Sequence, residues 1–239
     1  MFPSLPDNEV HVWFCRPETI QDEKKISAYR SILSEQEIEQ HHRFHFEKDK
    51  HNYLVSHALL RHALSKYADV KVSEWQFSSN AHGKPELIQG TGLPVINFNL
   101  THTDGLCACV VTLNMACGID AENIHRKNRL DAIAQRMFAE EELAMLRKNK
   151  NIQHQFYDLW TLREAYVKAL GTGLAGSSKD FYFEVDAKNL SACINFRNGK
   201  QAESSHWQFK LFEPTQEHRL SIAFASSEPV SVQMTEFIP

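Results

Sequence analysis

The sequence predicts an α+β fold, because its helical and strand-like segments occur in blocks and do not alternate regularly. A strand, a long helical region and two further strands fill roughly the first half of the chain. After one more short strand, three helices precede a run of four strands. A regular parallel sheet would require a crossover, usually a helix, between successive strands, and neither half has that pattern.

The first elements follow from hydrophobic spacing and helix-capping residues. Val10, Val12 and Phe14 alternate with other side chains, which predicts a half-buried strand. The capping box at 34–37 (S-E-Q-E) opens a helical region that extends toward residue 67, with room for a break in its His-rich part.

The remaining elements are bounded by turn residues. Residues 81–85 (A-H-G-K-P) have the composition of a turn, and Asp104-Gly105 marks the tip of a loop between two strands. Gly171 is placed to end the last helix. We expect strands at 94–99, 106–112, 117–122, 181–185, 192–196, 207–212 and 220–225, and helices at 130–138, 140–150 and 153–170.

Length, charge and cysteine content exclude several classes of protein. The 239 residues suffice for one large or two small domains, and a net charge of −4 argues against a protein that coats nucleic acid. Five cysteines without a C-x-x-C pair favour neither a disulfide framework nor a zinc site. With no signal peptide and no apolar run of about 20 residues, we expect a soluble, cytoplasmic monomer that binds neither membranes nor nucleic acid.

The densest group of chemically active residues is carried by one strand and one helix. Asp120 and Glu122 are two apart on a predicted strand and should face the same way. Glu164 and Lys168 are four apart on the helix at 153–170 and should lie one above the other. Arg163 falls within the apolar stripe of that helix, and the sequence offers no explanation for it.

Each pair alone has an ordinary structural explanation, a solvated strand edge or a surface ion pair. Together, Asp120, Glu122 and Glu164 offer three oxygen ligands for Mg²⁺, with positions left for water and a substrate phosphate. Lys168 would face the same phosphate. This set suits the transfer of a phosphoryl-type group.

Four ordered segments resemble the 4′-phosphopantetheinyl transferases of the Sfp type. They are G-K-P at 83–85, F-N-L-T-H at 98–102, G-I-D-A-E at 118–122, and W-T-L-R-E-A-Y-V-K at 160–168 followed by G-T-G-L at 171–174. A lone G-K-P or G-I-D-x-E is a weak signal, but the ordered set is specific. The resemblance spans about residues 30–185.

The resemblance implies a pseudodimer of two similar α/β subdomains, 1–115 and 116–239, with the active site in the cleft between them. It implies transfer of the phosphopantetheine arm of coenzyme A, the co-substrate, to a serine of an apo acyl or peptidyl carrier protein, with release of 3′,5′-ADP. Asp120, Glu122 and Glu164 would bind Mg²⁺, and Glu164 and Lys168 would be catalytic. Coenzyme A contacts are implied for Lys168 on the pyrophosphate, for His102 and Thr101 at the 3′-phosphate, and for Lys84 near the adenosine.

Some points stay open at this stage. Family members carry basic residues where this chain has Glu37 and Gln40, so His41, Arg43 or Lys48 would have to compensate, or the 3′-phosphate is held less tightly. Glu37 also has a structural role as the acidic member of the capping box. The sequence does not settle which carboxylate is the general base, which carrier is modified or where it docks. The alternatives are a Mg²⁺-dependent phosphohydrolase or nuclease and a non-catalytic module that binds coenzyme A or a carrier.

Overall fold

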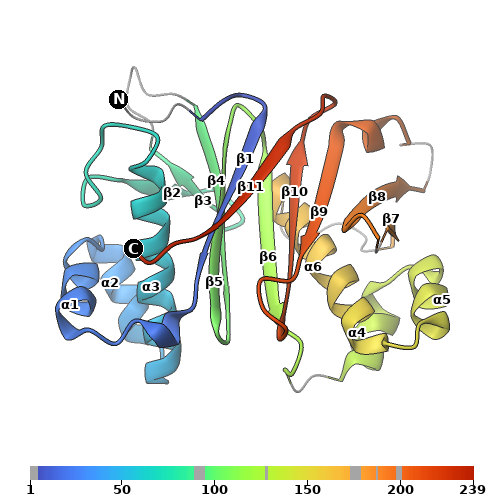
Figure 1. Cartoon of the computed structure of the whole chain (residues 1–239), viewed down its shortest axis with the longest axis horizontal. Coiled ribbons are helices and arrows are strands. Elements are labelled where there is room, and N and C mark those ends of the chain that lie inside the picture. The colour runs from blue at the N-terminus through green and yellow to red at the C-terminus, as the bar shows by residue number, and fades with distance from the viewer. Residues whose placement is uncertain (1–4, 89–94, 127–128, 173–178, 187, 198–200) are drawn as a thin grey trace. The chain divides into compact units, whose positions relative to one another are not determined.

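The computed structural model describes residues 5–88, 95–126, 129–172, 179–186, 188–197 and 201–239. The chain forms two compact units, and each has its own sheet and helices (Figure 1). Unit 1 consists of Met1–Met115 and Val230–Pro239, and unit 2 of Ala116–Pro229. The expected second subdomain, 116–239, therefore differs from unit 2 at its end, because the last strand pairs with the first strand of the chain.

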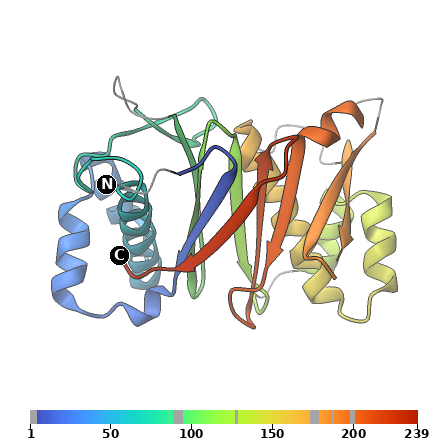
Figure 2. The same cartoon turned by 45° about the horizontal axis from the view of Figure 1, so that its top comes forward.

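Unit 1 contains a four-stranded sheet in the order β11-β1-β5-β4, in which β1 is parallel to β11 and antiparallel to β5. Helix α3 packs against this sheet, and a two-stranded hairpin, β2–β3, adjoins β4 (Figure 2). The elements are β1 (Glu9–Cys15), α1 (Glu23–Ser31), α2 (Glu35–Arg43), α3 (Glu47–Leu64), β2 (Phe77–Ser79), β3 (Pro85–Leu87), β4 (Ile96–Thr103), β5 (Leu106–Leu113) and β11 (Ser231–Glu236), with a 3₁₀ turn at Pro17–Thr19.

Local residues explain where the helices of unit 1 begin. Asp22 accepts a hydrogen bond from Lys24 N at the start of α1, and the predicted capping box of Ser34 and Glu37 opens α2. The helical region breaks between α2 and α3, within the His-rich part. Apolar side chains of α3 and of the inner strands, Cys107 and Cys109 among them, form a core.

Unit 2 is an antiparallel five-stranded sheet in the order β6-β10-β9-β8-β7, and helix α6 packs on β6 and β10. A second hydrophobic core lies between α6, α4, α5 and the strands. The elements are β6 (Cys117–Asn123), α4 (Leu130–Met137), α5 (Glu140–Lys148), α6 (Ile152–Leu170), β7 (Phe181–Asp186), β8 (Ser191–Phe196), β9 (Trp207–Phe212) and β10 (His218–Ala225), with a 3₁₀ segment at Gln201–His206.

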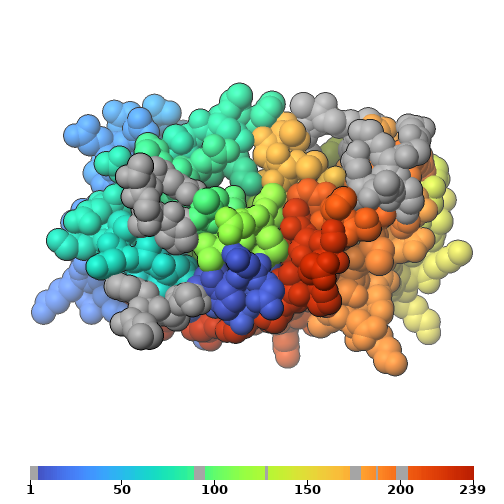
Figure 3. Space-filling model, turned by 90° about the horizontal axis from the view of Figure 1, so that it is seen from above, coloured from blue at the N-terminus to red at the C-terminus, as the bar shows by residue number. Residues whose placement is uncertain are grey.

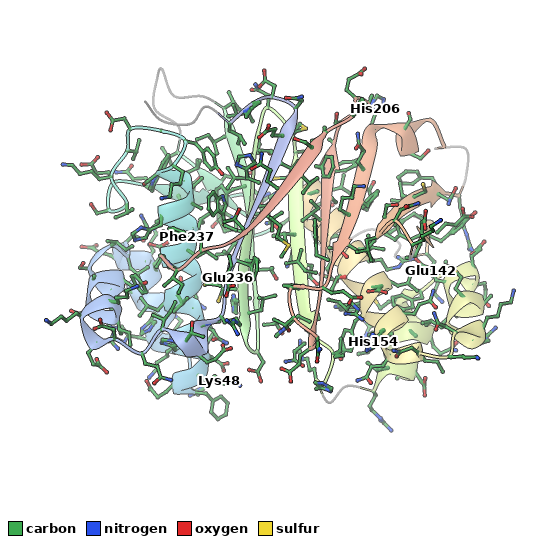
Figure 4. All side chains as sticks on the ribbon, in the orientation of Figure 1. Lys48, Glu142, His154, His206, Glu236 and Phe237 are labelled. Carbon is green, nitrogen blue, oxygen red and sulfur yellow. The ribbon has the colours of Figure 1, made fainter. Side chains whose placement is uncertain are left out.

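A buried ion pair explains the charged residue within the apolar stripe of α6. The guanidinium of Arg163 donates to the carboxylate of Glu142, which is fully buried on α5 (Figure 4). Glu142 also accepts from Phe183 N at 3.0 Å, and Arg163 donates to Phe181 O at 2.9 Å. Both charges are therefore paired and hydrogen-bonded, as burial requires, and the pair ties α5, α6 and β7 together.

The predicted α+β class is confirmed, and the predicted strands and helices recur with shifted ends. Strand β4 extends to Thr103, so that Asp104 and Gly105 form a tight turn and not a loop. The sequence analysis missed α1, the two short strands of the hairpin and β11. Pro94 was expected to begin a strand and lies outside the described residues.

Candidate active site

The acidic strand of unit 2 presents its carboxylates to helix α6. Asp120 on β6 lies opposite Ser221 on β10, and the Ser221 hydroxyl contacts the Thr161 hydroxyl on α6 at 2.8 Å. Directly opposed residues of antiparallel strands point to the same face, so Asp120 and Glu122 face α6. The intervening Ile119 and Ala121 are buried on the other face.

A glycine allows the helix to approach this strand closely. A Cβ atom added at Gly118 would lie 2.1 Å from the backbone oxygen of Ala165 and 2.5 Å from the backbone nitrogen of Ala169. No side chain fits in that space, so only glycine permits this spacing between β6 and α6. The spacing brings Glu164 and Lys168 next to the acidic strand.

Each of the two strand carboxylates is bonded to a cation. Lys168 Nζ donates to Asp120 Oδ1 at 2.6 Å and to the backbone oxygen of Ile119 at 3.2 Å. Arg126 Nη1 lies 3.2 Å from both carboxylate oxygens of Glu122. Asp120 and Glu122 are largely buried, with side chains 9% and 13% exposed.

The third carboxyl group belongs to the same electrostatic cluster. Burial, together with the negative charges of Asp120 and Glu122, raises the pKa of Glu164 to about 7. Burial and the charge of Asp120 also raise the pKa of Glu122, while Arg126 opposes that rise. The three carboxyl groups thus repel one another, and a cation among them would relieve that repulsion.

The donor set suits a hard divalent cation, because carboxylate oxygens are the protein ligands that Mg²⁺ prefers. Yet within the described ranges no three His, Cys, Asp or Glu side chains are already arranged to ligate one ion. The structure thus brings the predicted ligands into one cluster but does not preform a metal site. Two of the three are instead engaged by Lys168 and Arg126.

The other predicted residues lie in unit 1. On β4, Thr101 is buried and His102 is exposed. Lys84 follows Gly83 directly after the turn at residues 81–82, and its backbone N–H donates to Asn80 Oδ1 at 3.0 Å. Figure 3 shows one face of the molecule, to which side chains of both units contribute. Gly173 and Leu174 of the last motif lie outside the described residues.

The position of the expected basic residues is occupied by a buried ion pair. Glu37 accepts from Arg61 at 2.5 Å, and Arg61 is only 1% exposed. His57 lies 3.9 Å from Glu37, and burial lowers the pKa of His57 to about 4. Glu37 and His57 line a cavity of about 180 Å³ in unit 1, together with Pro85 and Leu100.

The three basic candidates for the 3′-phosphate differ in their surroundings. Arg43 contacts Gln40 at 3.5 Å, and Lys48, which is labelled in Figure 4, forms an exposed ion pair with Asp104. For His41, burial lowers the pKa.

Sequence reasoning missed Arg126 and Arg61. Arg61 was detectable as a charged residue on the apolar face of a helix, whereas nothing in the sequence pattern marks Arg126.

Three grouped carboxyl groups beside an ammonium, on an α+β scaffold, form a set of side chains that suits an enzyme of phosphoryl-group transfer. Comparisons with known proteins identify the family. The 4′-phosphopantetheinyl transferase superfamily model matches residues 116–224, and the model of the N-terminal part of 4′-phosphopantetheinyl transferases matches residues 21–113. The chain belongs to the 4′-phosphopantetheinyl transferase superfamily.

Two relatives found by sequence agree with this assignment. The chain is 32% identical to the 4′-phosphopantetheinyl transferase HetI of Nostoc sp. over 174 residues, which cover 72% of this chain and 73% of that protein. It is 29% identical to Sfp of Bacillus subtilis over 166 residues, 69% of this chain and 70% of Sfp. The solved holo-[acyl-carrier-protein] synthase of Thermotoga maritima matches 47% of this chain and 64% of its own, with a TM-score of 0.39 and 20% identity.

No helix in the described part of the chain combines the length and the apolar character needed to cross a bilayer.

Proposed function

We propose that this protein transfers the 4′-phosphopantetheine arm of coenzyme A to a serine of an apo acyl or peptidyl carrier protein and releases 3′,5′-ADP. The observation that carries the proposal is the cluster of Asp120, Glu122, Glu164 and Lys168, which lies within the region matched by the superfamily model. The motifs of unit 1 and the match at 21–113 support a substrate contact by that unit as well.

Asp120, Glu122 and Glu164 would hold Mg²⁺. When bound, the ion would neutralise the pyrophosphate of coenzyme A as the phosphoanhydride bond breaks. Lys168 would then donate its N–H groups to the departing phosphate oxygens. Because Lys168 now donates to Asp120, its ammonium needs only a local change of side-chain conformation to reach a phosphate beside that carboxylate.

Glu164 is the best candidate for the general base. Without metal, burial and the neighbouring carboxylates raise the pKa of Glu164 to about 7, and a bound Mg²⁺ would lower that pKa again. Glu164 would therefore act as the base from its place beside the reacting groups, directly or through a water molecule. It would take the proton from the carrier serine, and the serine oxygen would attack the β-phosphorus. Asp120 is less suitable, since the ammonium of Lys168 already stabilises its charge.

In unit 1, Lys84, Thr101 and His102 are proposed to contact the nucleotide part of coenzyme A. Pro85 and Leu100, the neighbours of Lys84 and Thr101 in the sequence, both line the cavity of unit 1, which supports a shared binding region. An exposed imidazole such as His102 can donate to a phosphate oxygen, and its charge when protonated strengthens that bond.

The test combines the protein with coenzyme A, Mg²⁺ and a panel of apo carrier proteins. Intact-mass spectrometry should show the gain of one phosphopantetheine on a carrier serine, and relative rates would rank the carriers. Release of phosphate without carrier modification would support a phosphohydrolase instead, and binding of coenzyme A without either product would support a non-catalytic module.

A matched pair of variants tests the role of Glu164. Replacement of Glu164 by Gln should abolish transfer while the fold survives. Glu184→Gln changes an exposed glutamate on β7 of the same unit in the same way and should leave the rate unchanged. A Glu164→Gln variant that transfers at the rate of the unaltered protein would rule out both proposed roles of this residue.

We also propose that the enzyme is a cytoplasmic monomer. The support is the composition of the chain: its five cysteines form no disulfide within the described residues, and its net charge is −4. Light scattering after size exclusion tests the monomer, and fractionation of the source cells tests the location.

A further inference from the structure

The second cation of the cluster, Arg126, has no place in the proposed chemistry. Its Nη1 atom is equidistant, at 3.2 Å, from the two carboxylate oxygens of Glu122. One nitrogen between two carboxylate oxygens occupies the position that a bidentate cation would take on that carboxylate. The carboxylate of Glu122 is therefore bonded to the guanidinium of Arg126, just as the carboxylate of Asp120 is bonded to the ammonium of Lys168.

The backbone around Arg126 is held in place by hydrogen bonds. Arg126 N donates to Asn123 O at 3.1 Å, which closes a turn directly after β6. The Tyr157 hydroxyl on α6 donates to Arg126 O at 3.2 Å, and the Gln153 side chain donates to the backbone oxygen of Ile124. The loop is thus fixed to the helix that carries Glu164, and the backbone of Arg126 is held at a place from which its side chain bonds Glu122.

The two partners differ in their exposure. The side chain of Arg126 is 59% exposed and that of Glu122 is 13% exposed. The guanidinium can therefore move into solvent at little cost in free energy. The carboxylate of Glu122 cannot, because it is largely buried. An exposed arginine that bonds a largely buried carboxylate stabilises its charge, but any competing cation can displace it.

We propose that Arg126 is an internal competitor for the divalent cation at Glu122 and thereby lowers the metal affinity of the site. This inference rests on the proposed Mg²⁺ site. Arg126 is a positioning residue that acts through Glu122, and it must release that carboxylate before both oxygens can bind metal. Removal of the guanidinium should therefore tighten metal binding.

The expected effect follows from the strength of such pairs. Solvent-exposed ion pairs contribute about 0.2–1 kcal/mol, which corresponds to a change of about 1.4- to 5-fold in an equilibrium constant. We use this range because the Arg126 side chain is mostly exposed. Arg126→Gln should lower the dissociation constant of the metal by that factor. Because Arg126 is mostly exposed, this variant should fold.

In the experiment, the protein is titrated with Mn²⁺, and the concentration of unbound Mn²⁺ is measured by electron paramagnetic resonance. Mg²⁺ is then added to compete for the same site. Arg197→Gln is the matched control, since it removes the same charge from another ion pair of unit 2, with Glu141. Tighter binding in Arg126→Gln but not in Arg197→Gln supports the inference.

Four other outcomes are decisive against one proposal or the other. Unchanged or weaker binding in Arg126→Gln overturns the competition, as does equal tightening in both variants, which would reflect net charge alone. If the unaltered protein binds no metal, or if Asp120→Asn binds as well as the unaltered protein, the proposed Mg²⁺ site itself fails, irrespective of Arg126.

Discussion

Replacement of Gly118 by Ala should separate the two halves of the candidate active site. The added Cβ would lie 2.1 Å from Ala165 O, whereas ordinary contacts begin at 3.4 Å. Strand and helix must therefore move apart by about 1.3 Å, the difference between these distances. Since the obstructing atoms belong to the helix backbone, no side-chain rotation can avoid the movement. A shift of that size would stretch the Lys168–Asp120 hydrogen bond, which is 2.6 Å long, beyond hydrogen-bond distance.

A displacement of about 1 Å in a catalytic group can reduce the rate about 100-fold, so we expect a loss of that order in the kcat of carrier modification. Overpacking should also cost about 1–3 kcal/mol of stability. The assay is the initial rate of phosphopantetheine addition, followed by intact-mass spectrometry at a temperature where the variant is folded.

Gly171→Ala is the matched control. Gly171 ends α6 with a φ of 68°, so alanine there is strained in its backbone by about 1–2 kcal/mol. Both variants should lose stability, but only Gly118→Ala should lose most of its activity. A Gly118→Ala variant that transfers at the unaltered rate would refute the argument from spacing.

Three further predictions concern stability, pH and coenzyme binding. Glu142→Gln leaves the buried Arg163 without its counter-charge and should cost about 3–5 kcal/mol in urea denaturation; a loss below about 1 kcal/mol would contradict this. The pKa of Glu164 is about 7 in the folded protein against 4.5 ordinarily, so stability falls as pH rises between these values. Without metal, Glu164→Gln should be more stable by about 1–3 kcal/mol above pH 7 and equally stable below 4.5. Finally, His102→Ala should raise the KM for coenzyme A roughly tenfold and affect 3′-dephospho-coenzyme A less; equal losses would exclude a 3′-phosphate contact.

The core of the candidate site could be predicted from sequence because two residue spacings determine it, that of a strand face and that of a helix face. Residues two apart share a strand face, which placed Asp120 with Glu122, and residues four apart share a helix face, which placed Glu164 with Lys168. The order of the motifs indicated that this strand and helix serve one site. Their mutual electrostatic influence follows from the packing of α6 on β6.

What sequence reasoning missed depends on contacts between distant residues. Arg163 is paired with Glu142, 21 positions earlier, and Arg61 with Glu37, 24 positions earlier. Such pairs follow from tertiary packing and leave no periodic signal. Arg126 differs, because its partner is only four residues away, but their contact depends on the turn after β6, which the amino-acid types do not specify.

The pairing of β11 with β1 makes unit 2 an insertion within unit 1. The chain leaves unit 1 between β5 and β6 and returns between β10 and β11, so two peptide connections join the units. A single protease cut between β5 and β6 would give two fragments, and the pairing of β1 with β11 would then join them without a covalent bond. Circular permutants opened within the connection after β10 would retain every strand, although the β1–β11 pair would then depend on the new linker.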